Sequence, residues 1–289
     1  MASLNYRHSY HAGNIADVFK HYVLTLVLEA LQRKDTPFCV VDSHAGAGLH
    51  ELERGGEHEQ GIGQLWPERS AWPMLASYLE LVGRFNPGGR LRFYPGSPMV
   101  IREFLRPGDR AVLMELHPQE YGSLRECMYH APGVAVHHIN AWNGIRAFVP
   151  PKENRGLLLI DPPYEQPDEF ADVIAALRYG MRHWRNGLYV AWYPIKLRRR
   201  IESFHRAVAG LKASAHAVEF ITLPLDMDRR LNGSGLILIN PPWQLLDVLR
   251  VNLPPLAQRL AGAGGAPQVR FIALSGPDVR ASRPRGVRF

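Results

Sequence analysis

The sequence predicts an α/β fold in which helices cover a doubly wound, mostly parallel β-sheet. Short and nearly continuous apolar runs recur along the chain, which is typical of strands buried on both faces. Segments with the apolar spacing of helices fall between several of these runs. The chain has 289 residues, of which 46% are hydrophobic and 21% charged, so it can bury a sizeable core without disulfides or metal ions.

The first predicted element is a helix over residues 14–34, where apolar side chains recur three and four residues apart and Asn14 is a suitable N-cap. The strand FCVVD (38–42) follows and ends in a loop that contains glycines. Later helices are predicted over 168–184 and 194–211. The remaining predicted strands are AVLME (111–115), VAVHHI (134–139), GLLLID (156–161), GLYVAWY (187–193), VEFITLPL (218–225) and GLILIN (235–240).

The segment after the first strand departs from this alternation. It has a charged, glycine-rich stretch and then the helical pattern PMLASYLELVGRF. The first strand ends at Asp42 and the next at Glu115. This separation is far longer than the about 20 residues between the glycine loop and the ribose-binding acid of a plain nucleotide-binding unit. We therefore predict a mostly helical insertion near the active-site edge, suited to gripping a nucleic acid. The predicted division is a sheet domain of 1–48 and 93–274, an insertion of 49–92 and a disordered basic tail of 275–289.

The composition excludes several classes of protein. Cys39 and Cys127 are too few for a disulfide framework or a four-cysteine zinc site, which favours a reducing compartment. No run of 18 apolar residues occurs, and the N-terminus lacks the apolar region of a signal peptide, so we expect a cytoplasmic protein without membrane spans. The formal net charge of +7 fits a polyanionic partner such as RNA or DNA, and it equally fits ordinary variation in an Arg-rich proteome.

The tetrapeptide Asp161-Pro162-Pro163-Tyr164 directly follows an apolar strand. It could be a simple strand-ending turn, because proline cannot continue a β-ladder. It also suits methylation of an exocyclic amine. The Asp161 carboxylate and the Pro162 carbonyl could accept both amine hydrogens and free the nitrogen lone pair, and Tyr164 could stack on an extruded base. The two prolines would keep this loop rigid.

The loop Asp42-Ser43-His44-Ala45-Gly46-Ala47-Gly48 resembles the cofactor loop of Rossmann-like methyltransferases that use S-adenosylmethionine. A single G-x-G also fits NAD enzymes, but the third glycine of the dinucleotide fingerprint is missing here. Glu115, at the end of the next strand, could accept hydrogen bonds from both ribose hydroxyls of the cofactor.

A second candidate tetrapeptide, Asn240-Pro241-Pro242-Trp243, also follows an apolar strand. It comes late in the chain, where we expect an edge hairpin strand. Asp161 instead follows a strand expected near the centre of the sheet, where ligands bind in this class of fold. The topology therefore favours Asp161.

Seven motifs together resemble the RlmJ family, which methylates N6 of a single adenine in 23S ribosomal RNA. They are YRHSYHAGNIADVFKH, VVDSHAGAG, YPGSP, MELHP, LLLIDPPYE, LYVAWYP and INPPW, which run from Tyr6 to Trp243. The resemblance implies a Rossmann-like methyltransferase that uses S-adenosylmethionine and acts on protein-free ribosomal RNA. We expect a monomer without a metal.

The resemblance also implies the site residues. Asp161, Pro162 and Tyr164 would be catalytic, and Tyr6 would contact the RNA base. The implied cofactor-binding residues are His21, His44, Gly46, Ser97, Glu115, Asn140, Ala141 and Asp161. Asn140-Ala141 stands where the family usually has Asp-Gly, so cofactor affinity could differ.

Alternative interpretations accompany several of these residues. Thirteen histidines suggest a metal site, but those near the N-terminus lack the spacing and nearby carboxylate of a helical zinc site. His21 could be a surface or interface residue, and Ser97 a turn residue. Leu197-Arg198-Arg199-Arg200 could be a solvated helix face or could contact RNA phosphates.

Two other functions remain open on the sequence. A DNA adenine-N6 methyltransferase would use the same catalytic tetrapeptide, although no separate DNA-reading module is evident. A non-catalytic nucleic-acid-binding protein, linked to the use of external DNA, would be expected to carry damage in the Asp161 loop or the cofactor loop. Both loops are intact in the sequence.

Overall fold

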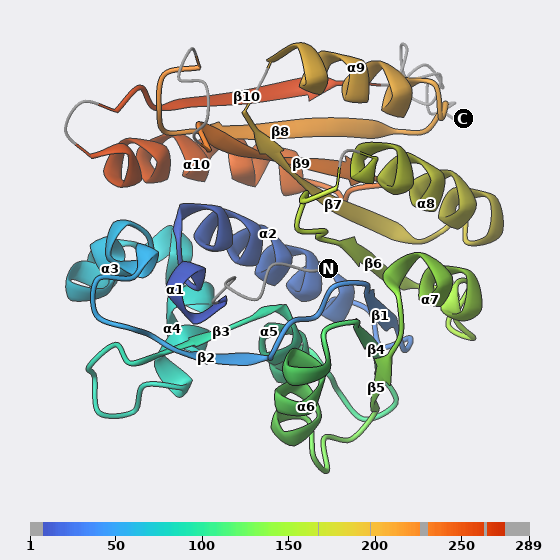
Figure 1. Cartoon of the computed structure of the whole chain (residues 1–289), viewed down its shortest axis with the longest axis horizontal. Helices are drawn as coiled ribbons and strands as arrows, with labels where there is room; N and C mark the ends of the chain where they lie inside the picture. The colour runs from blue at the N-terminus through green and yellow to red at the C-terminus, as the bar shows by residue number, and fades with distance from the viewer. Residues whose placement is uncertain (1–7, 167, 197, 226–230, 263–264, 275–289) are drawn as a thin grey trace, which may run out of the picture.

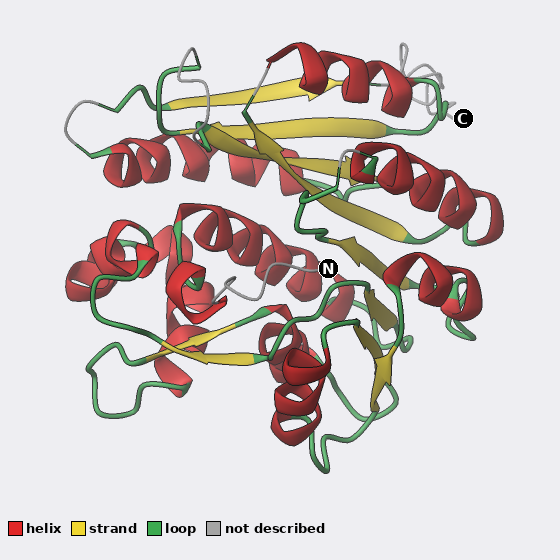
Figure 2. Ribbon diagram, viewed as in Figure 1, coloured by secondary structure: helices red, strands yellow, loops and turns green. Residues whose placement is uncertain are grey.

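A single eight-stranded sheet runs through the molecule, with helices on both of its faces (Figures 1 and 2). The computed structural model describes residues 8–166, 168–196, 198–225, 231–262 and 265–274. Tyr6 and the predicted tail 275–289 lie outside the described residues. Among the described residues, no helix combines the length and apolar character that crossing a membrane requires.

Five neighbouring strands are parallel and follow the Rossmann order, so the predicted α/β fold is confirmed. The sheet order is β10-β8-β9-β7-β6-β1-β4-β5. The strands are β1 (Cys39–Asp42), β4 (Arg110–Glu115), β5 (Val134–His138), β6 (Gly156–Ile160), β7 (Leu188–Ile195), β8 (Ala215–Ile221), β9 (Gly233–Ile239) and β10 (Gln268–Ala273). Strand order reverses between β1 and β6, and the carboxyl ends of strands at such a switch point are where ligands bind in open α/β sheets.

Alternate residues of the strands feed two separate hydrophobic cores. Val40 of β1 packs in the core beneath α2 (Ile15–Gln32), whereas its neighbour Val41 packs in the core beneath α8 (Glu169–His183). The first core is also covered by α5 (Ser97–Phe104), α6 (Pro118–Cys127) and α10 (Leu245–Ala261). The second is also covered by α7 (Ala141–Phe148) and α9 (Arg198–Ala209).

Helix α2 begins where the sequence predicts. Asn14 has extended backbone angles, and its side chain accepts a hydrogen bond from the Asp17 backbone N–H, as an N-cap does. The helix is buried over most of its length, and its buried residues include the polar side chains Lys20, His21 and Thr25. A helix that is buried almost all round places such side chains inside the protein rather than in water.

The segment after the glycine-containing loop that follows β1 leaves the main sheet. Strands β2 (Leu49–Glu51) and β3 (Phe93–Pro95) pair antiparallel, and the chain between them forms short helices. These are α3 (Ile62–Leu65), α4 (Ala76–Arg84) and the 3-10 helices η1 (Glu57–Gln60), η2 (Trp66–Ala71) and η3 (Pro73–Leu75). Because β3 pairs with β2, the segment outside the main sheet extends through Pro95. Its apolar side chains share one core with α2, and its role in gripping nucleic acid stays a prediction.

The expectation that Asn240 follows an edge strand is wrong. Strand β9 lies between β7 and β8 and runs antiparallel to both. Its carboxyl end therefore lies at the opposite edge of the sheet from the carboxyl ends of β1 and β6. There Asn240 donates from Nδ2 to the carbonyl oxygens of Arg185 and Gly187, at 3.2 and 3.0 Å. The second tetrapeptide is thus remote from the Asp161 loop, for a stronger reason than the one predicted.

Candidate active site

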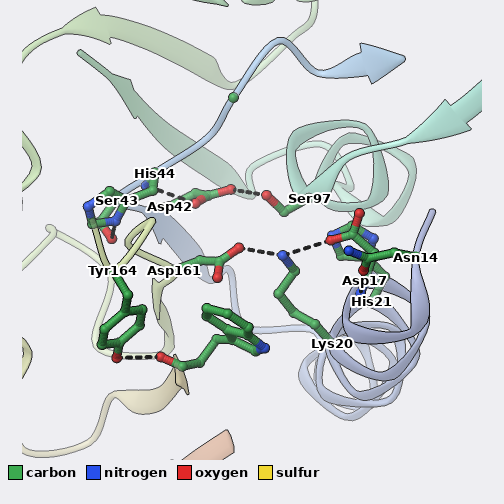
Figure 3. Close-up of polar contacts among 12 residues, drawn as sticks. Asn14, Asp17, Lys20, His21, Asp42, Ser43, His44, Ser97, Asp161 and Tyr164 are labelled. Atoms are coloured by element: carbon green, nitrogen blue, oxygen red, sulfur yellow. Dashed lines mark hydrogen bonds and ion pairs between the residues drawn. The ribbon is translucent and has the colours of Figure 1, made fainter. Parts of the chain in front are cut away.

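Two aspartates meet at the point where the strand order reverses (Figure 3). Asp42 is the last residue of β1, and Asp161 directly follows β6, which pairs with β1 in parallel register. Parallel pairing brings both carboxyl ends to the same edge of the sheet. Two residues far apart in the sequence therefore lie at one edge of the sheet.

The loop after β1 presents bare backbone to open space at Gly46. Gly46 and Gly48 have φ angles of 64° and 90°, which favour glycine. A methyl group added at Gly46 would meet no atom within 4 Å. The Gly46 N–H donates to Glu115 Oε2 at 2.8 Å, and the His117 N–H donates to Oε1 at 2.7 Å. Glu115 is held in one orientation, and each of its oxygens keeps a further lone pair for a ligand hydroxyl.

Ser97 contacts the loop through Asp42 rather than acting only as a turn residue. Its hydroxyl donates to Asp42 Oδ2 at 2.7 Å, and the His44 N–H donates to Oδ1 at 3.3 Å. Asp42 is fully buried, and this burial raises the pKa of its carboxyl to about 7, although the Ser97 hydrogen bond opposes the shift. The interaction ties the start of α5 to the end of β1, beneath the glycine loop.

Because the folded pKa of Asp42 lies above its ordinary value of 3.8, its burial should make the protein less stable as the pH rises from about 4 to 7. A one-unit shift corresponds to about 1.4 kcal/mol. We expect Asp42→Asn to remove about 2 kcal/mol of this loss, measured as the free energy of urea unfolding at pH 5 and pH 7. Asp247→Asn, the same change on an exposed side chain of α10, should leave it unchanged. Equal pH dependence in Asp42→Asn and the parent protein would contradict the assignment.

Asp161 forms a buried ion pair with Lys20 of α2, a residue that was not predicted from the sequence. Lys20 Nζ donates to Asp161 Oδ2 and also lies 3.0 Å from Asp17 Oδ1. The side chains of Lys20, Asp17 and Asp161 are 10%, 21% and 18% exposed, so the pairing is screened little by water. Figure 3 shows the ammonium group between the two carboxylates. Asp17 in turn accepts a hydrogen bond from the Gly13 N–H at 3.0 Å.

Burial and ion pairing shift the pKa values of this cluster in opposite directions. Burial raises the pKa of Asp161, and Lys20 only partly opposes it. Burial would also raise the pKa of Asp17, but Lys20 and its other partners lower it to about 2. Burial alone would lower the pKa of Lys20, and the two carboxylates raise it well above its usual value. Lys20 therefore stays charged across the physiological range, and Asp161 is the more readily protonated of the two acids.

The two predicted cofactor histidines occupy different settings. His21 is only 3% exposed, and its Nδ1 lies 2.8 Å from the Tyr94 hydroxyl, so it is not a surface residue. His44 lies in the glycine loop, where Nδ1 is 2.7 Å from Ser43 Oγ and the ring meets Trp142 edge-on. Burial lowers the pKa of both imidazoles to about 3, so both are neutral at pH 7. Their contact with a cofactor stays a prediction.

Tyr164 is anchored beside Asp161. Its hydroxyl donates to the Trp192 carbonyl oxygen at 2.8 Å, and its ring packs against those of Trp192 and Phe170. The residue has a φ of 55°, which is uncommon outside glycine and fixes the direction in which the loop turns. Pro162 is buried and Pro163 exposed. The Tyr164 side chain is thus held in place by its contacts, while its stacking on a base stays a prediction.

Asn140 caps helix α7. Its Oδ1 accepts hydrogen bonds from the backbone N–H groups of Trp142 and Asn143, at 3.0 and 3.4 Å. Ala141 is the first residue of that helix and is buried. The side-chain oxygen of Asn140, an implied cofactor-binding residue, is therefore already shared with the helix. No group of three or more potential metal ligands occurs in the described part of the chain.

Comparisons with known proteins agree on one family. A family model described as ribosomal RNA large subunit methyltransferase D, RlmJ, matches residues 35–273. Two proteins named ribosomal RNA large subunit methyltransferase J, from Escherichia coli K12 and Haemophilus influenzae, are 41% and 40% identical over 271 residues. Each alignment covers 90% of this chain and 95% of the relative.

A solved structure has the same fold over most of this chain. The crystal structure of a protein from Legionella pneumophila superposes with a TM-score of 0.85 at 32% sequence identity. The match covers 90% of this chain and 98% of the other. Asp42, Glu115 and Asp161 all lie within the residues that the family model matches.

Proposed function

The chain belongs to the RlmJ family of ribosomal RNA large subunit methyltransferases, and from this membership we propose that it methylates N6 of a single adenine in 23S ribosomal RNA. The proposed methyl donor is S-adenosylmethionine. The observation that carries the proposal is the Asp161 carboxylate, held by Lys20 at the strand switch point and facing the same sheet edge as the glycine loop. We further propose that the protein acts in the cytoplasm as a monomer, on RNA free of ribosomal proteins and without a metal.

The residues at this edge suit S-adenosylmethionine. The backbone at Gly46 faces open space, and Glu115 is held so that its free lone pairs could accept both ribose hydroxyls. His44 contributes a neutral ring to the loop. Asn140 and Ala141 lie at the start of helix α7. When bound there, the cofactor supplies an electrophilic methyl group on a sulfonium.

The protein's own groups would act on the target amine. An adenine amine is a poor nucleophile because its lone pair is delocalised into the ring. The Asp161 carboxylate and the Pro162 carbonyl oxygen would accept its two hydrogens and favour a pyramidal nitrogen. As nitrogen acquires the methyl group, its N–H becomes acidic and Asp161 accepts the proton. The raised pKa of Asp161 favours this transfer.

Lys20 would hold the Asp161 carboxylate in position throughout the reaction. It donates to Oδ2 of Asp161, so the other oxygen can face the amine. The rigid double proline keeps that oxygen in place, which reduces reorganisation during the reaction. Extruding the adenine costs a few kcal/mol, and contacts along the RNA would have to offset this cost.

The direct test is methyl transfer by the purified protein from labelled S-adenosylmethionine to a protein-free 23S ribosomal RNA transcript and to DNA of the same sequence. We expect label in RNA alone, recovered after digestion as N6-methyladenosine from one nucleotide and located by mass mapping. Label confined to DNA, or methyl on another atom, would overturn the proposal. Calorimetry with S-adenosylmethionine separates an enzyme from a non-catalytic binding protein, which should show no heat of binding.

A further inference from the structure

A groove leads away from the Asp161 loop between helices α8 and α9. Its first part is a hollow of about 120 Å³, whose lining includes Tyr164 and Gln166 of the loop together with Lys196 and Arg200. A second hollow of about 550 Å³ continues between the two helices and includes Arg199, Arg200 and Arg206. Both hollows share Arg200 and Phe170, so they form one continuous groove that begins at the catalytic loop. In Figure 1, α8 and α9 lie over the same side of the sheet.

The three consecutive arginines at the start of α9 have two different roles. Arg198 Nη1 donates to both oxygens of Glu219 at 2.7 Å, and Glu219 of β8 is fully buried. Removing either partner of such a pair leaves a buried charge, so Arg198 anchors the helix to the sheet. Its charge is therefore already paired inside the protein and is not free to contact phosphate.

The other cations of the groove remain available to a ligand. Arg199, Arg200 and Lys196 are exposed, and none takes part in an ion pair among the described residues. Arg206 donates to the hydroxyl of Ser203, a neutral partner. The groove therefore concentrates positive charge beside the catalytic loop, and no acid is among the described residues that line its two hollows.

Helix stability does not account for this arrangement. The first turn of α9 contains no acidic residue, although the partial positive charge at a helix N-terminus favours acids and disfavours arginines. Two exposed arginines there repel the helix end and each other. An anionic ligand in the groove would relieve both repulsions.

We infer that the groove between α8 and α9 binds the sugar-phosphate backbone of the RNA strand adjoining the target adenosine. The inference rests on the proposed function. An enzyme that extrudes a base must hold the flanking backbone while that base leaves its stack. Exposed arginines and a lysine suit phosphates, and such contacts fix the register of the RNA without reading its sequence. The groove begins at Tyr164, so a strand bound along it leads directly to Asp161.

The test compares Arg199→Gln/Arg200→Gln with Arg185→Gln. Arg185 is an exposed arginine of the α8–β7 loop, at the opposite edge of the sheet. Binding of a labelled, protein-free ribosomal RNA fragment is measured by filter retention over a series of KCl concentrations. We expect the double variant to bind about 10-fold more weakly or worse. The slope of log affinity against log salt should fall by about 1.4, because each contact to a single strand contributes about 0.7.

Kinetics of methyl transfer provide the second readout. The KM for RNA should rise in the double variant, while kcat and the KM for S-adenosylmethionine stay within about twofold. Arg185→Gln should match the parent protein in every measurement, and melting temperatures should agree among all three proteins.

The inference is overturned if the double variant keeps the parent affinity and salt slope, or if Arg185→Gln loses as much. In either case, methylation by the parent protein would leave the proposed function intact. Groove-dependent RNA binding without methylation would instead overturn the proposed function alone. A parent protein that binds no RNA would overturn both.

Discussion

Asp161→Asn should lower kcat for methyl transfer by about 10²–10³-fold, the usual loss when one preorganised polar group is removed from an active site. The amide keeps the size of the carboxylate, but it cannot accept a proton from the amine. Lys20 would hold the amide oxygen, since an ammonium group only donates. The amide NH₂ would then face the substrate amine, donor against donor. The effect should appear in kcat at saturating S-adenosylmethionine and RNA.

The rival tetrapeptide provides the control. Trp243 follows Asn240 at the opposite edge of the sheet and is 81% exposed, so Trp243→Ala should fold normally and keep the parent kcat. If Trp243→Ala lost activity while Asp161→Asn retained it, the catalytic assignment would be wrong. Similar affinity for S-adenosylmethionine in all three proteins would show that the loss lies in the methyl-transfer step.

Seven strands of the main sheet could be predicted because they depend on local apolar patterns, whereas β2, β3 and β10 were not predicted. The shared position of the candidate site residues follows from one rule of topology. Each predicted apolar run forms a strand, and its ends differ by a few residues from those expected. Once Asp42 and Asp161 follow parallel strands, their meeting at one sheet edge is required. The hydrogen bond between Glu115 and the glycine loop follows from the same rule, because β4 pairs with β1 in parallel.

The place of β9 could not be predicted from its sequence. GLILI is an apolar run that suits either an edge or an internal strand, and the periodicity does not state which neighbours it has. The structure inserts β9 antiparallel between β7 and β8. This choice depends on the whole sheet, and it decides which edge the second tetrapeptide occupies.

Lys20 was missed because its partner lies 141 residues away along the chain. A single lysine on a predicted helix is usually solvated. One signal was present: Phe19 precedes Lys20, and Tyr22 and Val23 follow it, so a helix with those residues in the core has little room for a solvated side chain at position 20. Arg198 was misjudged for a similar reason, since its buried partner Glu219 lies 21 residues further along the chain, in strand β8.

Lys20→Met should be the most destabilising of the substitutions discussed, because it leaves Asp17 and Asp161 buried without their cation. Losing one partner of a buried ion pair typically costs about 3–5 kcal/mol. In the parent protein the pKa of Asp17 is about 2, below its ordinary 3.8, so its contribution to stability is complete above about pH 4 and lost toward pH 2. Without Lys20, burial would raise the pKa of both carboxyls, and the variant should gain stability as the pH falls from 7 to 4.

Urea unfolding at pH 4, 7 and 9 measures this difference. The difference in the free energy of unfolding between the parent and Lys20→Met should be largest at pH 7 and 9 and smaller at pH 4. Lys152→Met makes the same change on a side chain that is 73% exposed, and it should stay within about 0.5 kcal/mol of the parent. The double variant Lys20→Met/Asp161→Asn should recover part of the stability lost in Lys20→Met, since it removes one of the stranded charges.

The pH profile of catalysis distinguishes a positioning residue from a merely structural one. Lys20 opposes the rise in the pKa of Asp161 that burial causes, so Lys20→Met should move the acid limb of kcat/KM to higher pH. Activity of the folded variant should then recover in part as the pH rises, although its stability does not. A profile parallel to that of the parent, reduced equally at every pH, would show that Lys20 supports the fold without tuning the acceptor. Unchanged stability at pH 7 would contradict the buried ion pair itself.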